Sequence, residues 1–145
     1  MFRTILVPTD FSSCSRKAYD AAAELAVRFD GKIILMTVVD QRILDSAGRL
    51  GLGTKRTVEA AALKETKRQF TRFVKALRDR GRIREEAIVF GAPDAEIAKK
   101  AREIRADLIV MGSHGKTGPI DYVLFGSTAE KIVRMTPCPV LTVPL

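Results

Sequence analysis

The segment from Met111 to Glu130 holds the residue types best suited to binding a charged ligand. It contains four glycines and the only histidine of the chain, His114, and it begins where an apolar run ends. Glycine can adopt positive φ and bring the backbone close to a ligand, and free N–H groups in such a turn bind anions. Gly112 and Gly115 can therefore take positive φ, and the pattern predicts that the backbone at this turn binds an anion.

A second anion-binding element begins at Gly126, which directly precedes a helical pattern. Ser127 as the N-cap and Glu130 three residues later fit a capping box, which marks the start of a helix. The free N–H groups and the positive dipole end of a helix start favour phosphate, and the hydroxyl of Thr128 lies in the same turn. Together the two elements predict a site for a polyphosphate.

Two side chains near these glycines have chemistry of their own. Asp10 follows the first apolar run and could cap a helix or bind a ligand; Ser12 and Ser13 are better placed as caps, which favours the ligand role. His114 has no neighbouring nucleophile pattern, so we interpret it as a binding residue and predict no catalytic residue. One histidine and two cysteines without CxxC spacing cannot assemble an ordinary zinc site, and we predict no metal-ligating side chains.

Two common nucleotide-binding motifs are incomplete in this sequence. Gly115-Lys116-Thr117 ends like a P-loop, but that motif needs glycine at position 110, where Val110 stands. Gly51-Leu52-Gly53 begins like the dinucleotide fingerprint, but its third glycine would fall at Arg56. The glycines at 112, 115 and 126 therefore follow a different pattern.

The elements that position these residues alternate along the chain. Runs rich in β-branched residues predict strands at Thr4–Pro8, Lys32–Val39, Ala87–Phe90, Asp107–Met111 and Val140–Val143. Periodic patterns predict helices at Ser13–Asp30, about Thr57–Arg80 closed by Gly81, Asp94 to about Arg105, and Ser127 to about Met135. We therefore expect an α/β fold, a single Rossmann-like domain over residues 1–145, with an open parallel five-stranded sheet of order 3-2-1-4-5 and helices on both faces.

In such a sheet, ligands bind beyond the carboxyl ends of the strands, at the point where the winding direction reverses. With the expected order this point lies between the first and fourth strands, so Asp10 and Gly112 would face the same crevice. The connection from Asp40 to Arg56 is longer than usual loops. It is either a mobile lid or a partly helical excursion around Ile43, and the sequence leaves both alternatives open.

The composition limits the class of protein. Hydrophobic residues make up 46% of the chain, but no apolar run reaches the roughly 20 residues of a membrane span, so we expect a cytoplasmic protein without a membrane partner. The net charge of +8 attracts anions, including nucleic acid. We interpret the main basic cluster as a solvated helix face, and the scarcity of aromatics among basic residues argues against a nucleic-acid partner. This cluster consists of Lys64, Lys67, Arg68, Arg72 and Lys75.

The chain resembles the universal stress protein family over its whole length. Besides the glycines, the residues that carry the resemblance are Ile5-Leu6-Val7-Pro8-Thr9-Asp10, Gly91-Ala92-Pro93 and Pro137-Cys138-Pro139-Val140-Leu141-Thr142-Val143. The family's ATP-binding branch has Gly, two residues, Gly, nine residues, Gly, and then Ser or Thr.

Gly112, Gly115, Gly126 and Ser127 match this pattern, except that ten residues separate the last two glycines. The extra residue either forms a bulge at Gly118-Pro119 or shifts the positions of the outer phosphates.

The resemblance implies an ATP-binding regulatory or stress-response protein that holds ATP together with Mg²⁺. It implies that Asp10 holds the ribose, that Val38 contacts adenine, and that the glycine turns wrap the phosphates. The residues implied to bind the nucleotide are Pro8, Thr9, Asp10, Val38, Met111, Gly112, Ser113, His114, Gly115, Gly126, Ser127 and Thr128.

The resemblance also implies a homodimer joined through the last strand, Val140 to Val143, and a signalling partner that the sequence does not identify. An apolar edge strand is normally paired or covered, which supports the dimer independently. Two alternatives remain: a family member that binds no nucleotide and acts only through protein contacts, and a very slow ATPase. The intact glycine pattern argues against the first, and the lack of a base and a metal carboxylate pair argues against the second.

Overall fold

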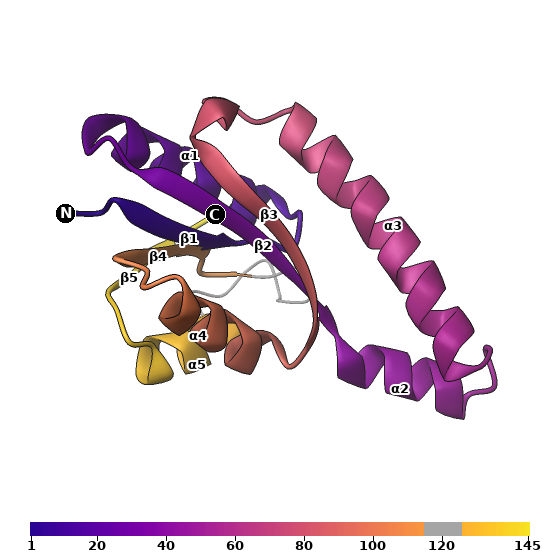
Figure 1. The fold of residues 1–145 in the computed structure, drawn as a ribbon. Coiled ribbons are helices and arrows are strands. Elements are labelled where there is room, and N and C mark those ends of the chain that lie inside the picture. The colour runs from indigo at the N-terminus through magenta and orange to yellow at the C-terminus, as the bar shows by residue number, and fades with distance from the viewer. Residues whose placement is uncertain (115–125) are drawn as a thin grey trace.

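A computed structural model describes residues 1–114 and 126–145 and shows a β-sheet between two layers of helices (Figure 1). The described strands are β1 (Thr4–Pro8), β2 (Lys32–Asp40), β3 (Ile83–Gly91), β4 (Leu108–Gly112) and β5 (Val140–Val143). They lie in the order β3-β2-β1-β4-β5, and each neighbouring pair is parallel. The predicted α/β fold and strand order are confirmed.

The described helices cover both faces of this sheet. They are α1 (Ser13–Arg28), α2 (Gln41–Arg49), α3 (Lys55–Lys75), α4 (Pro93–Glu103) and α5 (Ser127–Met135), with a 3₁₀ turn at Arg80–Arg82. Ile5 and Val7 of β1 pack with α1 and α3, whereas Leu6 packs with α4 and α5, because successive strand side chains point to opposite faces. None of the helices within the described ranges is long and apolar enough to cross a membrane.

The end of α3 differs from the prediction. The helical pattern extended to Arg80 and Gly81, but α3 ends at Lys75. The backbone beyond it is held from α1, where the buried Tyr19 hydroxyl donates a hydrogen bond to the Arg78 carbonyl at 2.9 Å. Burial raises the pKa of Tyr19 to about 12, which keeps this hydroxyl a neutral donor. A contact between distant segments therefore directs the chain out of the helix, and the local pattern could not reveal it.

β3 is longer than predicted. The sequence indicated Ala87–Phe90, whereas the strand spans Ile83–Gly91. Arg84, Glu85 and Glu86 are exposed because β3 forms an edge of the sheet. Because these charged side chains interrupt the apolar pattern of a strand, the sequence pattern did not predict the first half of β3.

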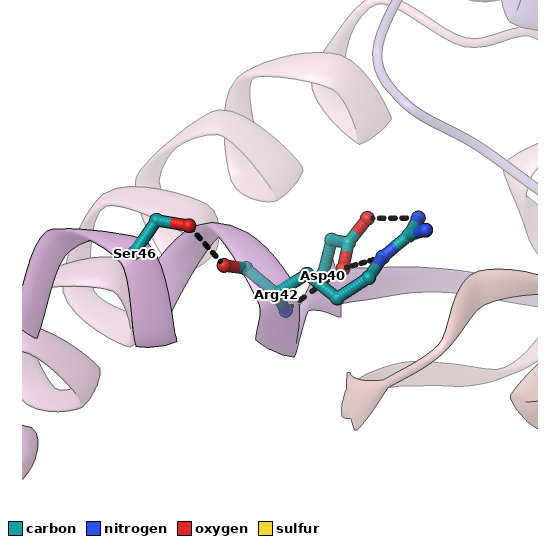
Figure 2. Close-up of polar contacts among 3 residues, drawn as sticks. All are labelled: Asp40, Arg42 and Ser46. Atoms are coloured by element: carbon teal, nitrogen blue, oxygen red, sulfur yellow. Dashed lines mark hydrogen bonds and ion pairs between the residues drawn. The ribbon is translucent and has the colours of Figure 1, made fainter. Parts of the chain in front are cut away.

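The connection from Asp40 to Arg56 contains α2, so the helical alternative is confirmed. Asp40 caps this helix: its Oδ1 accepts a hydrogen bond from Arg42 N at 3.0 Å, and its Oδ2 accepts one from Arg42 Nη2 at 2.8 Å (Figure 2). Ser46 Oγ donates to the Arg42 carbonyl one turn later, at 2.9 Å. The hydrogen bonds from Arg42 lower the pKa of Asp40 below its ordinary value. α2 and α3 then form a helical hairpin that extends past the end of β2 (Figure 1).

Candidate functional site

The carboxyl ends of β1 and β4 lie side by side in the middle of the sheet, because these strands are parallel neighbours in which Leu6 pairs with Ile109. The chain passes from β1 to α1 on one face of the sheet, and α5, which follows β4, packs on the other face. Thr9 directly follows β1, and Ser113 directly follows β4. The exposed fractions of these two residues are only 7% and 8%. Two buried hydroxyl groups therefore lie at the point where the winding direction reverses, as the strand order predicts.

The loop after β1 is fixed by its own polar side chains. Thr9 Oγ1 lies 2.9 Å from Ser15 Oγ and accepts a hydrogen bond from Phe11 N at 3.0 Å. Asp10 Oδ1 accepts from Ser12 N at 3.0 Å. Ser12 is the N-cap of α1, since its hydroxyl accepts from Ser15 N at 3.2 Å. A serine rather than Asp10 therefore caps this helix, as the sequence analysis expected, and Asp10 sits half-buried at the end of β1.

Phe11 anchors this loop to α3, and sequence reasoning did not single it out. Its φ is +66°, an uncommon value for a residue other than glycine. Its ring meets the rings of Phe70 and Phe73 edge-on, with centroids 5.7 and 5.6 Å away. The residue beside Asp10 is thus held by the inward face of α3. The sequence alone does not reveal this cluster, because the three rings come into contact only in the folded protein.

Gly112 does not adopt the positive φ that its lack of a side chain allows. It ends β4, and the described glycines with positive φ are Gly51, Gly53 and Gly91. Glycine is needed at 112 for a different reason: a Cβ there would lie 2.7 Å from the sulfur of Cys14 and 3.2 Å from its carbonyl carbon. Cys14 is buried, and its thiol donates to the Val143 carbonyl at 3.3 Å. Close packing of α1 on the end of β4 therefore excludes a side chain at this position.

Ser113, which directly follows β4, links β4 to β5 and to the start of α5. Its N–H donates to the Val143 carbonyl at 2.9 Å, and its own carbonyl accepts from Gly126 N at 2.6 Å. Its hydroxyl lies 2.9 Å from His114 Nδ1. The start of α5 is consequently held against the end of β4, because Ser113 directly follows β4 and Gly126 directly precedes α5.

The start of α5 corrects the predicted capping box. The N-cap is Gly126, whose carbonyl accepts from Glu130 N at 3.0 Å, and Ser127 is the first residue inside the helix. Gly126 has no side chain with which to cap the helix, and the cap residue makes no side-chain hydrogen bond. An α-helix leaves its first N–H groups without partners inside the helix, and these groups attract anions. Ser127 is exposed and Thr128 half-buried in this turn.

The remaining predicted site residues are Pro8, Val38, Met111 and Gly115. Met111, buried at the end of β4, belongs to the apolar cluster on the α4 and α5 side of the sheet, and Val38 packs against the same cluster. Pro8 ends β1 and is buried. Gly115 lies outside the described residues. Within residues 1–114 and 126–145, no three His, Cys, Asp or Glu side chains are grouped so that they could hold a metal ion.

A comparison with known proteins agrees with this architecture. The sequence model of the Universal stress protein family matches residues 1–144. The chain belongs to the universal stress protein family. Universal stress protein MJ0531 of Methanocaldococcus jannaschii is 33% identical over 144 residues, which cover 99% of this chain and 82% of that protein. Universal stress protein MJ0577 of the same organism is 32% identical and is covered to 95% of its length, with 99% of this chain aligned.

Solved structures of universal stress proteins share the fold. The structure of protein MJ0577 superimposes with a TM-score of 0.84 at 32% identity and covers 100% of this chain and 97% of that one. A universal stress protein solved in complex with cAMP superimposes with a TM-score of 0.66 at 26% identity, covering 99% of this chain and 97% of that one. At least one protein of this fold and family has therefore been crystallised with a nucleotide.

Proposed function

We propose that this universal stress protein is an ATP-binding regulatory protein that holds ATP with Mg²⁺ at the carboxyl ends of β1 and β4. The observation that carries the proposal is that two elements meet at one edge of the sheet. The polar loop from Thr9 to Asp10 follows β1, and the start of α5, whose N-cap is a glycine, is tied to the end of β4 through Ser113. The complex of a related protein with cAMP supports a nucleotide as the ligand.

In this proposal each part of the nucleotide meets a suitable chemical group. Val38 and Pro8 offer apolar surface to adenine, and the carboxylate of Asp10 accepts hydrogen bonds from the ribose hydroxyls. The N–H groups at the start of α5 and the hydroxyls of Ser127 and Thr128 bind the outer phosphates.

The remaining proposed contacts come from the end of β4, where Met111 lies below the nucleotide and the stretch from Gly112 to Gly115 wraps the ribose and first phosphates. Mg²⁺ commonly binds through substrate phosphates and one or two carboxylates, and therefore does not require a cluster of acidic side chains. We further propose that two copies of the chain pair through β5, as argued in the Discussion.

The direct test is titration calorimetry of ATP with Mg²⁺ against the wild type and the variant Asp10→Asn. Asparagine keeps the oxygen that accepts from Ser12 N but removes the charge, so the loop is retained while the ribose contact weakens. We expect a loss of affinity of about tenfold to a hundredfold, since hydrogen bonds to charged groups contribute about 1.5–3 kcal/mol. Asp20→Asn, a half-buried aspartate on α1, is the matched control and should bind as the wild type does.

The outcomes of this titration separate the alternatives. No heat of binding and no rise in melting temperature with ATP would favour a family member that acts only through protein contacts, because a ligand of the folded state must stabilise it. Phosphate release measured in the same samples tests the ATPase. Turnover near the enzyme median of about 10 s⁻¹ would contradict a purely regulatory role.

A further inference from the structure

The outward side of α3 carries a concentrated positive charge. Phe70 and Phe73 point into the core, with exposed fractions of 3% and 5%. The opposite side of the same helix is exposed and basic. This basic face consists of Lys64, Lys67, Arg68, Arg72 and Lys75.

The basic face is poorly neutralised by the protein itself. The described residues form eight ion pairs, and only the pair of Arg68 with Glu65, at 2.8 Å, involves this face. Lys64, Lys67 and Lys75 take part in none of the ion pairs within residues 1–114 and 126–145. Like charges three and four residues apart on a helix repel one another, and the repulsion is relieved when an anion binds. The face therefore keeps a positive charge that favours the approach of a polyanion.

The surface of this face is also hollowed. A depression of about 430 Å³ is lined by Lys67, Arg68, Thr71, Arg72 and Lys75. Its lining contains no aromatic side chain on which single-stranded bases could stack and no large apolar side chain that would enter a lipid bilayer. Electrostatic attraction to a phosphate backbone needs neither of these groups.

We propose that the basic face of α3 binds the phosphate backbone of duplex nucleic acid without preference for base sequence. From Lys64 to Lys75 the helix extends about 16 Å at 1.5 Å per residue. A duplex presents one negative charge per about 1.7 Å of its axis, so several phosphates lie within reach of this length. The scarcity of aromatics argued against nucleic acid at the level of the sequence, but that argument applies to stacked single strands.

This surface is separate from the proposed nucleotide site. Phe11, which lies beside Asp10, contacts α3 through Phe70 and Phe73 on its inward side, whereas the basic face points away. The proposal therefore does not depend on ATP binding. If ATP binding is disproved, the proposal for the basic face is unaffected, and the reverse also holds.

The test is fluorescence anisotropy with a labelled DNA duplex of about 20 base pairs, titrated at salt concentrations from about 50 to 200 mM. The variant Lys67→Gln, Arg72→Gln, Lys75→Gln removes three charges and keeps good helix formers. We expect at least a tenfold loss of affinity, and a slope of log K against log salt shallower by about 2.7, which is three contacts at about 0.9 each.

The matched control is Lys32→Gln, Arg102→Gln, Lys131→Gln, which removes the same charges from exposed sites on β2, α4 and α5. It should bind the duplex within about threefold of the wild type, because its charges are remote from the bound phosphates. Circular dichroism of both variants verifies that they are folded. An RNA duplex of the same length, titrated in parallel, distinguishes the two sources of the same backbone, and binding of either supports the proposal.

Three results would overturn the proposal: no binding of either duplex at low salt, equal losses in the variant and the control, or binding of anionic vesicles in place of the duplex. Equal losses would show that the net charge of +8 attracts anions without a defined surface.

Discussion

At the scale of residues, Cys14 restricts the side chain that position 112 can carry at the end of β4, although the two positions are almost a hundred residues apart in the sequence. A Cβ at 112 would lie 2.7 Å from the Cys14 sulfur. Gly112→Ala should therefore destabilise the protein by about 1–3 kcal/mol, the usual cost of adding a methyl group to a close-packed site. Urea unfolding measures this loss as a lower midpoint.

Removing the sulfur tests the cause of that loss. In the double variant Gly112→Ala, Cys14→Ala, the contact with the sulfur is gone, while the carbonyl carbon at 3.2 Å remains. Part of the loss should be recovered, which gives a coupling energy of about 0.5–3 kcal/mol in a double-mutant cycle. Purely additive effects of the two substitutions would show that Gly112 is required for another reason.

The candidate site was partly predictable from single residues. Asp10, Ser113 and Gly126 were identified because polar or glycine residues directly follow strands or precede a helix, and local order along the chain carries that information. Gly112 was identified for its backbone freedom, whereas its close packing on Cys14 could not be seen in the sequence because Cys14 comes from another element. The predicted capping box was wrong because the N-cap is Gly126, one residue before Ser127. The hydrogen bond from Gly126 N to Ser113 O fixes where this helix begins.

At the scale of elements, the start of α2 depends on a charged cap. Asp40 accepts hydrogen bonds from the backbone and the guanidinium of Arg42, and these bonds lower the pKa of Asp40. A carboxyl group with a lowered pKa stabilises the folded state above its unfolded pKa of about 3.9, and the stabilisation is lost as the pH falls through the folded pKa. The beginning of α2 should therefore loosen in acid below this range.

NMR chemical shifts of the Cα atoms of α2 between pH 6 and pH 2 measure this loosening. We expect the wild type to lose helical shifts in α2 at acid pH. Asp40→Asn keeps a cap oxygen without the charge and should show no such titration, whereas Asp40→Ala should lose about 1 kcal/mol of local stability at neutral pH as well. Identical acid titrations in the wild type and in Asp40→Asn would exclude Asp40 as the responsible group.

The elements themselves were predictable to different degrees. The central strands, such as β1 and β4, are buried on both faces and therefore read as continuous apolar runs. The first half of β3 is polar because it lies at an edge, and the end of α3 is set by the contact of Tyr19 with Arg78. Periodicity reports which residues are buried within one element. It does not report contacts between elements.

At the scale of the whole molecule, the sheet formed by residues 1–114 and 126–145 ends in β3 on one side and in β5 on the other. The carbonyls of Pro139 and Val143 accept hydrogen bonds from the β4 side, at Ile109 N and Ser113 N. Backbone groups of alternate residues in a strand point to opposite sides, so Val140 and Thr142 direct theirs to the outer edge of β5. Unpaired groups on an apolar edge strand favour pairing with a second chain.

We predict that the protein is a homodimer joined through β5 and that Thr142→Pro shifts it to the monomer. Proline removes the outward N–H of residue 142, and proline is tolerated at edge strands where the inner ladder does not need that group. Thr142→Val, which keeps the N–H, is the matched control and should remain dimeric. Light scattering after gel filtration at about 10–50 μM reports the mass of each species, a range that detects dimers of micromolar affinity. A wild type with the mass of one chain would contradict the dimer, and a dimeric Thr142→Pro variant with native circular dichroism would place the interface elsewhere, for which the opposite edge at β3 is the next surface to test.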